Sequence, residues 1–164
     1  MDLVDQVGRR IRGLLGHGDH ATAMGGDDLM ADHLFDPAII KALMAEGVDN
    51  GKVILAVDKR IKNNPQVDMD DVTRVWVEED RILEIGKGLP RYNAFDTGIF
   101  LCSPALFPAL AGSIAAGDSS LSGGIRQLAG HRNAHAFDIG NRSWIDIDDE
   151  AAFIKAQKLV ALLR

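Results

Sequence analysis

Cysteine is nearly absent from this chain of 164 residues, which contains only Cys102. A single cysteine cannot form a disulfide within the chain, and we expect a cytoplasmic protein because the cytosol keeps thiols reduced. Basic residues are also in short supply: 18 Lys and Arg stand against 24 Asp and Glu, which gives a net charge of −6. Binding to a nucleic-acid backbone requires a basic surface, so this composition argues against a nucleic-acid partner.

Long hydrophobic runs are missing as well. The longest, residues 53–57 and 99–102, have the length of β-strands and fall far short of the roughly 20 apolar residues of a transmembrane helix. Residues 1–15 carry acids where a signal peptide would carry bases, and no uninterrupted apolar segment follows them. We therefore expect no direct insertion into a membrane.

What is present is typical of one globular α/β domain, with 46% hydrophobic and 26% charged residues. Capping residues and hydrophobic periodicity predict helices over residues 2–15, 36–47, 103–116, 118–130 and 150–164. Strands are predicted over residues 52–58, 94–102, 134–139 and 144–147, a hairpin over 73–77 and 81–85, and a loop over 16–28. Strands that alternate with helices predict a layered domain with a mostly parallel sheet.

Asp32 follows the short apolar run of residues 29–31, where a strand is expected to give way to a loop. Ligands of open parallel sheets bind beyond the carboxyl ends of the strands. One or two carboxylates there suit Mg²⁺, which keeps its other positions for water and phosphate. The alternative for Asp32 is a solvated loop acid.

A second acidic cluster, Asp146, Asp148 and Asp149, ends the short strand before the last helix. Asp146 and Asp148 are two residues apart, so in an extended segment both side chains project from one face. This cluster and Asp32 are two separated acidic positions at strand ends, and together they could hold one Mg²⁺ at the phosphates of a nucleotide. The alternative is a role as a helix cap, which we prefer for Asp149.

Asp96 lies within the otherwise apolar strand predicted over residues 94–102. A buried acid needs a hydrogen-bonding partner or a ligand, and either would serve Asp96. Gly98 leaves room for the close approach of another backbone or a ligand. Lys87 and Arg91 flank the turn before this strand and could bind a phosphate, with a solvated turn as the alternative.

Several well-known motifs are absent. There is no Gly-x-Ser-x-Gly motif of a nucleophilic serine and no phosphate-binding P-loop. The histidines have no cysteine or third clustered ligand to support a zinc site. A glycine pattern at residues 16–21 follows a helical segment rather than a strand, so it gives little support to a dinucleotide-binding oxidoreductase.

Three segments carry a resemblance to a known family. They read M-A-D-H-L-F-D-P at residues 30–37, I-G-K-G-L-P-R-Y-N-A-F-D-T-G-I-F-L-C-S-P-A-L-F at 85–107 and W-I-D-I-D-D-E-A-A-F at 144–153. Together they resemble the nucleotidyltransferases that activate phosphorylated sugars and polyols, in particular the CTP:inositol-1-phosphate cytidylyltransferases. The resemblance covers residues 29–164 in matching order.

The resemblance implies a Rossmann-like mixed sheet between helices, Mg²⁺ as the cofactor, and attack of the acceptor's phosphate on the α-phosphorus of an NTP. CTP is the implied nucleotide, and the implied acceptor is a phosphorylated polyol or sugar such as inositol 1-phosphate. By resemblance, Asp32 and Asp146 are metal ligands, with Asp148 as a further one. Lys87 contacts the acceptor's phosphate, Asp96 falls where the acceptor's hydroxyl groups are held, and Asp32 and Lys87 are the expected catalytic residues.

One departure from the family pattern concerns residues 1–28. Family members begin with a strand and a glycine-rich loop that cradles the triphosphate, and this segment has neither. We therefore divide the chain into residues 1–28, which do not match, and residues 29–164, a partial nucleotidyltransferase domain that lacks its first βα unit. Poor nucleotide binding and weak or no catalysis by the isolated chain are expected.

Two further expectations follow from this departure. A missing central strand would leave an apolar sheet edge, which invites pairing with a second copy of the chain in a homodimer. The alternative to an enzyme is a non-catalytic, degenerate relative that acts as a binding or interaction module.

Overall fold

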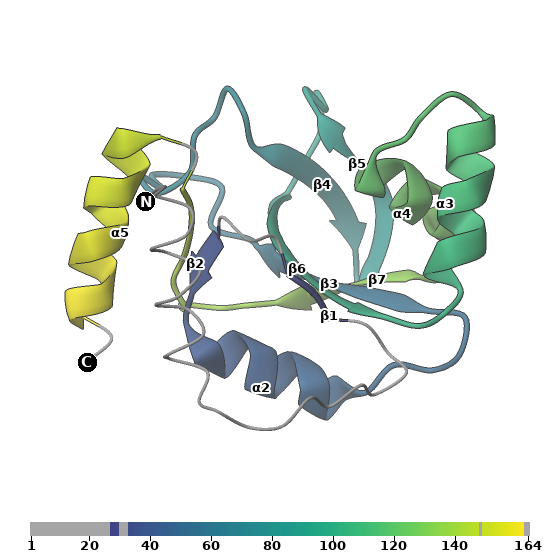
Figure 1. The fold of residues 1–164 in the computed structure, drawn as a ribbon, viewed down its shortest axis with the longest axis horizontal. Coiled ribbons are helices and arrows are strands. Elements are labelled where there is room, and N and C mark those ends of the chain that lie inside the picture. The colour runs from purple at the N-terminus through teal and green to yellow at the C-terminus, as the bar shows by residue number, and fades with distance from the viewer. Residues whose placement is uncertain (1–26, 30–32, 148, 163–164) are drawn as a thin grey trace, which may run out of the picture.

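The structure, a computed structural model, describes residues 27–29, 33–147 and 149–162. Figure 1 shows a central sheet with α2 along one side, α3 and α4 together at one end and α5 at the other end. The elements in chain order are β1 (Asp27–Leu29), β2 (His33–Phe35), α2 (Pro37–Glu46), β3 (Val53–Asp58), β4 (Thr73–Glu78), β5 (Arg81–Lys87), β6 (Ala94–Cys102), α3 (Leu106–Ala115), α4 (Leu121–Gly130), β7 (Ala134–Asp138), β8 (Trp144–Asp146) and α5 (Glu150–Leu162).

Local sequence sets the limits of α2. The side chain of Asp36 accepts a hydrogen bond from Ala38 N at 2.8 Å, and Pro37 occupies the first turn, where a missing N–H costs nothing. The helix ends at Gly47, which has a φ of +67° and donates its N–H to Met44 O. The predicted start and end of this helix are confirmed.

The other predicted elements from residue 52 onward are confirmed to within three residues at their boundaries, as far as residue 162. The predicted helix over residues 2–15 lies outside the described residues, and so does the predicted loop up to residue 26. Residues 27 and 28 of that loop belong instead to β1.

The larger sheet has six strands in the order β1-β6-β3-β7-β5-β4. Among the described strands only β3 and β7 pair in parallel, and the other ladders are antiparallel. The prediction of a mostly parallel sheet is therefore wrong, whereas a mixed sheet flanked by helices is confirmed. The sequences of β3 and β6 are continuously apolar because both faces of each strand are covered. A continuous apolar run does not indicate whether a strand pairs parallel or antiparallel with its neighbour.

Alternate residues of β3 face two different hydrophobic clusters. Leu55 and Val57 belong to the cluster that also holds Ile125 of α4, whereas Ala56 belongs to the cluster that holds Ile39 of α2. Helices therefore cover both faces of this strand.

A second, two-stranded sheet joins β2 to β8. In its antiparallel register His33 lies opposite Asp146. The next pair along the ladder, Leu34 and Ile145, packs against Ala156 of α5. Figure 1 shows α5 beside β2, away from α3 and α4. The small sheet thus brings residues that are far apart in the sequence to one side of the domain.

Strand β1 pairs antiparallel with β6, from Leu29 opposite Ile99 to Asp27 opposite Leu101. This stretch of the β6 edge is therefore occupied within the chain, and the homodimer expected at an open edge stays a prediction.

In the described part of the chain no helix has the length and apolar character needed to cross a membrane.

Candidate functional site

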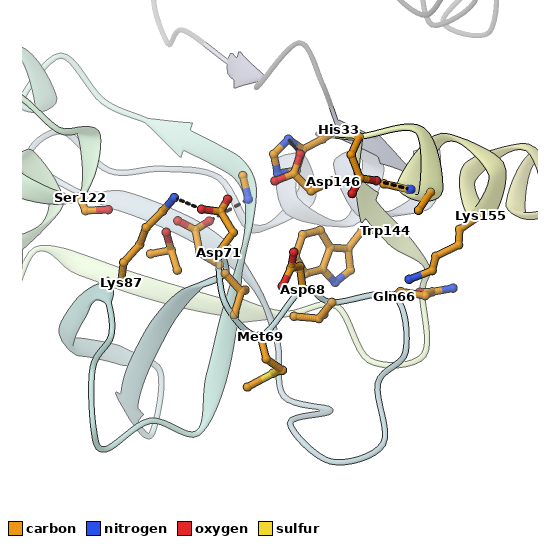
Figure 2. Close-up of a pocket in the computed structure, with 18 of the residues that line it drawn as sticks. His33, Gln66, Asp68, Met69, Asp71, Lys87, Ser122, Trp144, Asp146 and Lys155 are labelled. Carbon is orange, nitrogen blue, oxygen red and sulfur yellow. Dashed lines mark hydrogen bonds and ion pairs between the residues drawn. The ribbon is translucent and has the colours of Figure 1, made fainter.

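A cavity of about 580 Å³ lies between β6, β8, the start of α5 and the segment that precedes β4. Figure 2 shows Lys87 and Asp71 on one side of it and Asp146, Trp144 and Lys155 on the other. The ionisable side chains on its wall are His33, Asp68, Asp71, Lys87, Asp96, Asp146, Asp149 and Lys155. Its polar wall is thus rich in carboxylates and has one cation at each side.

Lys87 is the last residue of β5 and precedes Gly88, whose φ of +71° turns the chain. Its Nζ lies 2.5 Å from Asp71 Oδ1, and the side chains are 64% and 53% exposed, respectively. An exposed pair of this kind contributes little to stability, because water solvates both charges in either state. The pair with Asp71 is therefore a weak surface ion pair.

Asp96 is half-buried on the cavity wall, and its Oδ1 accepts a hydrogen bond from Gly98 N at 2.7 Å. Burial raises the pKa of this carboxyl to about 6, although the Gly98 N–H and the nearby His33 act in the opposite direction. The structural hydrogen bond foreseen for Asp96 is confirmed. Its contact with a ligand stays a prediction.

The raised pKa gives a prediction for stability. A folded-state pKa above the ordinary 3.8 means that the folded protein holds this proton more tightly than the unfolded chain does. The resulting stabilisation is present below pH 3.8 and is lost as the pH rises through about 6. Because asparagine cannot ionise, Asp96→Asn is expected to raise the free energy of unfolding at pH 7.5 by about 1 to 2 kcal/mol.

Urea unfolding of both proteins at pH 4.5 and pH 7.5 checks this result. The wild-type chain should lose more stability than Asp96→Asn between the two pH values. Parallel behaviour of the two proteins would show that Asp96 ionises as an ordinary surface acid.

Asp146 ends β8 at the cavity wall, and its side chain is 36% exposed. The Nδ1 atom of His33 lies 3.6 Å from Asp146 Oδ1, and the ring stacks on Trp144 with centroids 6.0 Å apart and 9° between planes. Asp32 and Asp148, the other predicted metal ligands, lie outside the described residues. The structure therefore places one member of the predicted metal set, and no three His, Cys, Asp or Glu side chains gather around a metal position in the part it describes.

The structure does not bring Arg91 to this cavity. Its guanidinium group lies over the indole of Trp76, 3.7 Å from the ring centroid, in a cation–π contact. A role for Arg91 in binding substrate stays a prediction without support from this geometry.

The cap predicted at Asp149 is confirmed, because Ala152 N donates to Asp149 Oδ1 at 2.7 Å.

Sequence reasoning misses Asp58, the fully buried last residue of β3. Its carboxylate accepts hydrogen bonds from Arg60 Nε and Nη2, each at 2.8 Å, from Asn64 Nδ2 at 3.0 Å and from Trp144 Nε1 at 2.9 Å. Burial alone would raise the pKa of Asp58, but the bonds from Arg60 and Trp144 hold it below its usual range. An acid at the end of an apolar strand, two residues before an arginine, was the available signal.

Lys155 of α5 is also missed by sequence reasoning. Its Nζ donates to Pro65 O at 3.1 Å, which joins α5 to the segment before β4 at the rim of the cavity. On the sequence it looks like an ordinary charged position of an amphipathic helix. Only the fold shows that this position borders the cavity.

Two curated relatives carry the name "Bifunctional IPC transferase and DIPP synthase". The chain is 34% identical over 122 residues to the protein from Rubrobacter xylanophilus, which covers 73% of this chain and 26% of the relative. It is 28% identical over 131 residues to the protein from Aquifex aeolicus, which covers 79% of this chain and 28% of the relative. The chain thus spans about a quarter of the length of these relatives. No protein-family model matches it.

Solved structures show the same likeness. The inositol-1-phosphate CTP transferase from T. maritima matches with a TM-score of 0.73 and 27% identity, over 88% of this chain and 58% of that chain. A UDP-glucose pyrophosphorylase in complex with UDP-glucose matches with a TM-score of 0.63 and 16% identity, over 88% and 59% of the two chains. At this lower identity the second match concerns the fold alone.

Proposed function

This chain belongs to the nucleotidyltransferase superfamily, and from that premise we propose that it takes part in cytidylyl transfer from CTP to inositol 1-phosphate. Pyrophosphate is the leaving group of this reaction. The proposal is supported by one observation above the others: Lys87, Asp96 and Asp146, which lie far apart in the sequence, line a single cavity. A phosphorylated sugar in place of inositol 1-phosphate would use the same groups.

We propose Mg²⁺ as the cofactor, with Asp146 as its described ligand and Asp32 and Asp148 as further ligands. The chemistry of Asp146 fits, because Mg²⁺ prefers carboxylate oxygens and this carboxylate is partly exposed on the cavity wall. Bound there, the ion would supply neutralisation of phosphate charge during the transfer.

Different side chains of the cavity bind different groups of the acceptor. The ammonium group of Lys87 binds the acceptor's phosphate in place of Asp71, and the carboxylate of Asp96 accepts hydrogen bonds from the hydroxyl groups of the polyol. The other carboxylates on the wall repel a phosphate that lies elsewhere in the cavity. Transfer of this kind depends on alignment and charge neutralisation, so no covalent nucleophile is needed.

Substitution of Lys87 tests this proposal. Lys87→Ala is expected to weaken the binding of inositol 1-phosphate about 10- to 100-fold, because a hydrogen bond to a charged group contributes roughly 1.5 to 3 kcal/mol. Asp71→Asn removes the ion pair but keeps the cation, so it should not weaken binding. Isothermal titration of the full chain in the presence of Mg²⁺ measures both dissociation constants.

Lys62→Ala, at an exposed lysine away from the cavity wall, is the matched control for lost positive charge. Equal loss of affinity in Lys87→Ala and Asp71→Asn would show that the pair matters for structure rather than for binding. Absence of binding at millimolar concentration would contradict the proposed acceptor. Release of pyrophosphate on addition of CTP separates an enzyme from a module that only binds.

A further inference from the structure

His33 is the first residue of β2, and only 6% of its surface is exposed. A polar ring at such a position is costly to bury unless its nitrogen atoms face polar groups. The ring lies where the small sheet of β2 and β8 meets β6 of the larger sheet. Both strands that flank it carry a residue of the proposed site, Asp146 on β8 and Asp96 on β6.

On one side the ring faces β8. His33 Nδ1 lies 3.6 Å from Asp146 Oδ1, directly across the antiparallel ladder, a separation within the range of an ion pair but too long for a hydrogen bond. The ring face stacks on Trp144, whose Nε1 is held by the buried carboxylate of Asp58 at 2.9 Å. The plane of the His33 ring is therefore fixed by a chain of contacts that ends in β3.

On the other side the ring packs on β6 at Gly98. A methyl carbon placed on Gly98 would lie 2.7 Å from His33 Nε2, closer than any side chain tolerates, and the φ of Gly98 is +74°. Gly98 does allow a close approach, but the group that approaches is a side chain and not the backbone or ligand that the sequence predicted. The N–H of the same glycine holds Asp96 Oδ1 at 2.7 Å. One ring therefore touches both the turn that holds Asp96 and the carboxylate of Asp146.

From this geometry we propose that His33 is a positioning residue, which uses its Nδ1 edge to hold the Asp146 carboxylate in the orientation that binds a divalent cation. The inference rests on the proposed function, because it treats Asp146 as a metal ligand. Residues that orient a metal ligand typically change metal affinity 10- to 100-fold when they are replaced. Gly98 and Trp144 contribute because packing against them restricts the His33 ring to one orientation.

Two substitutions separate the polar edge of the ring from its bulk. His33→Phe keeps the ring and the stack on Trp144 but has carbon in place of Nδ1. His33→Asn places an amide group near the position of Nδ1 but loses most of the ring. Binding of Mn²⁺ alone to the full chain is followed by electron paramagnetic resonance, and thermal unfolding is measured on the same samples. Asp146→Asn gives the reference for a lost ligand.

The inference predicts that the two variants rank in opposite orders for Mn²⁺ affinity and for unfolding temperature. His33→Phe should unfold near the wild-type temperature and bind Mn²⁺ 10- to 100-fold more weakly. His33→Asn should unfold at a lower temperature and yet regain most of the Mn²⁺ affinity, to within about threefold to tenfold of wild type. If His33 only filled space, affinity would follow stability, with the phenylalanine variant binding better.

Three results would overturn the inference: better Mn²⁺ binding by His33→Phe than by His33→Asn, wild-type affinity in Asp146→Asn, or no Mn²⁺ binding by the wild-type chain. The proposed function is judged separately, by the dependence of inositol 1-phosphate binding on Lys87. A chain that binds the acceptor through Lys87 while failing these Mn²⁺ tests would keep the proposed function and lose the role given to His33.

Discussion

Asp146→Asn is expected to lower the rate of CTP-dependent pyrophosphate release, which we expect to be slow already in the wild-type chain, about 100-fold or more. The substitution keeps the shape of the side chain and removes its charge, so the divalent cation that we propose would lose a carboxylate ligand at the cavity wall. A bound cation stabilises the charge that develops on transferred phosphates by several kcal/mol, and each 1.4 kcal/mol corresponds to about tenfold in rate. The effect should be the largest on function of any single change in this cavity.

The measurement is pyrophosphate release as a function of Mg²⁺ concentration, with the binding of inositol 1-phosphate followed in parallel. Asp146→Asn should retain acceptor binding through Lys87 while its rate responds little to Mg²⁺. Asp70→Asn is the matched control, because Asp70 is an exposed acid that does not line the cavity. Equal rates in Asp146→Asn and Asp70→Asn would rule out Asp146 as a metal ligand.

Asp58→Ala is expected to lower the free energy of unfolding by about 3 kcal/mol, the largest effect on stability among these substitutions. The carboxylate is fully buried and accepts hydrogen bonds from Arg60, Asn64 and Trp144. Its removal leaves the buried indole N–H without its acceptor. The Arg60 side chain is 36% exposed and can turn toward water, so the cost stays below that of a completely buried unpaired charge.

The pH dependence of this effect has a defined sign. Because the pKa of Asp58 is lowered in the folded protein, its contribution is present above the ordinary carboxyl pKa of 3.8 and is lost as the pH falls through the folded value. The difference between wild type and Asp58→Ala should therefore shrink in acid. Guanidinium unfolding at pH 7 and pH 3 measures it.

Asp138→Ala serves as the control for Asp58→Ala, because Asp138 also ends a strand but its side chain is 45% exposed. Its loss should change the free energy of unfolding by less than about 1 kcal/mol. A similarly small effect of Asp58→Ala would mean that the bonds to Arg60 and Trp144 do not outweigh the cost of burying the acid.

Local sequence determined most of the elements and the chemical type of the cavity wall. Capping at Asp36 and Gly47 depends on neighbours within a few residues, so the sequence alone predicts the limits of α2. The motifs around Lys87, Asp96 and Asp146 are contiguous as well, and they carry the resemblance to the nucleotidyltransferases that the comparisons bear out.

Contacts between distant residues were decided only by the tertiary structure. The direction of β6 beside β3 could not be read from two apolar runs, because burial on both faces produces the same pattern in either direction. Asp58 and Trp144 meet across 86 residues of sequence, and His33 finds its place only because Gly98 on another sheet lacks a side chain. Composition and spacing specify which groups a chain possesses, whereas packing specifies which of them share a cavity.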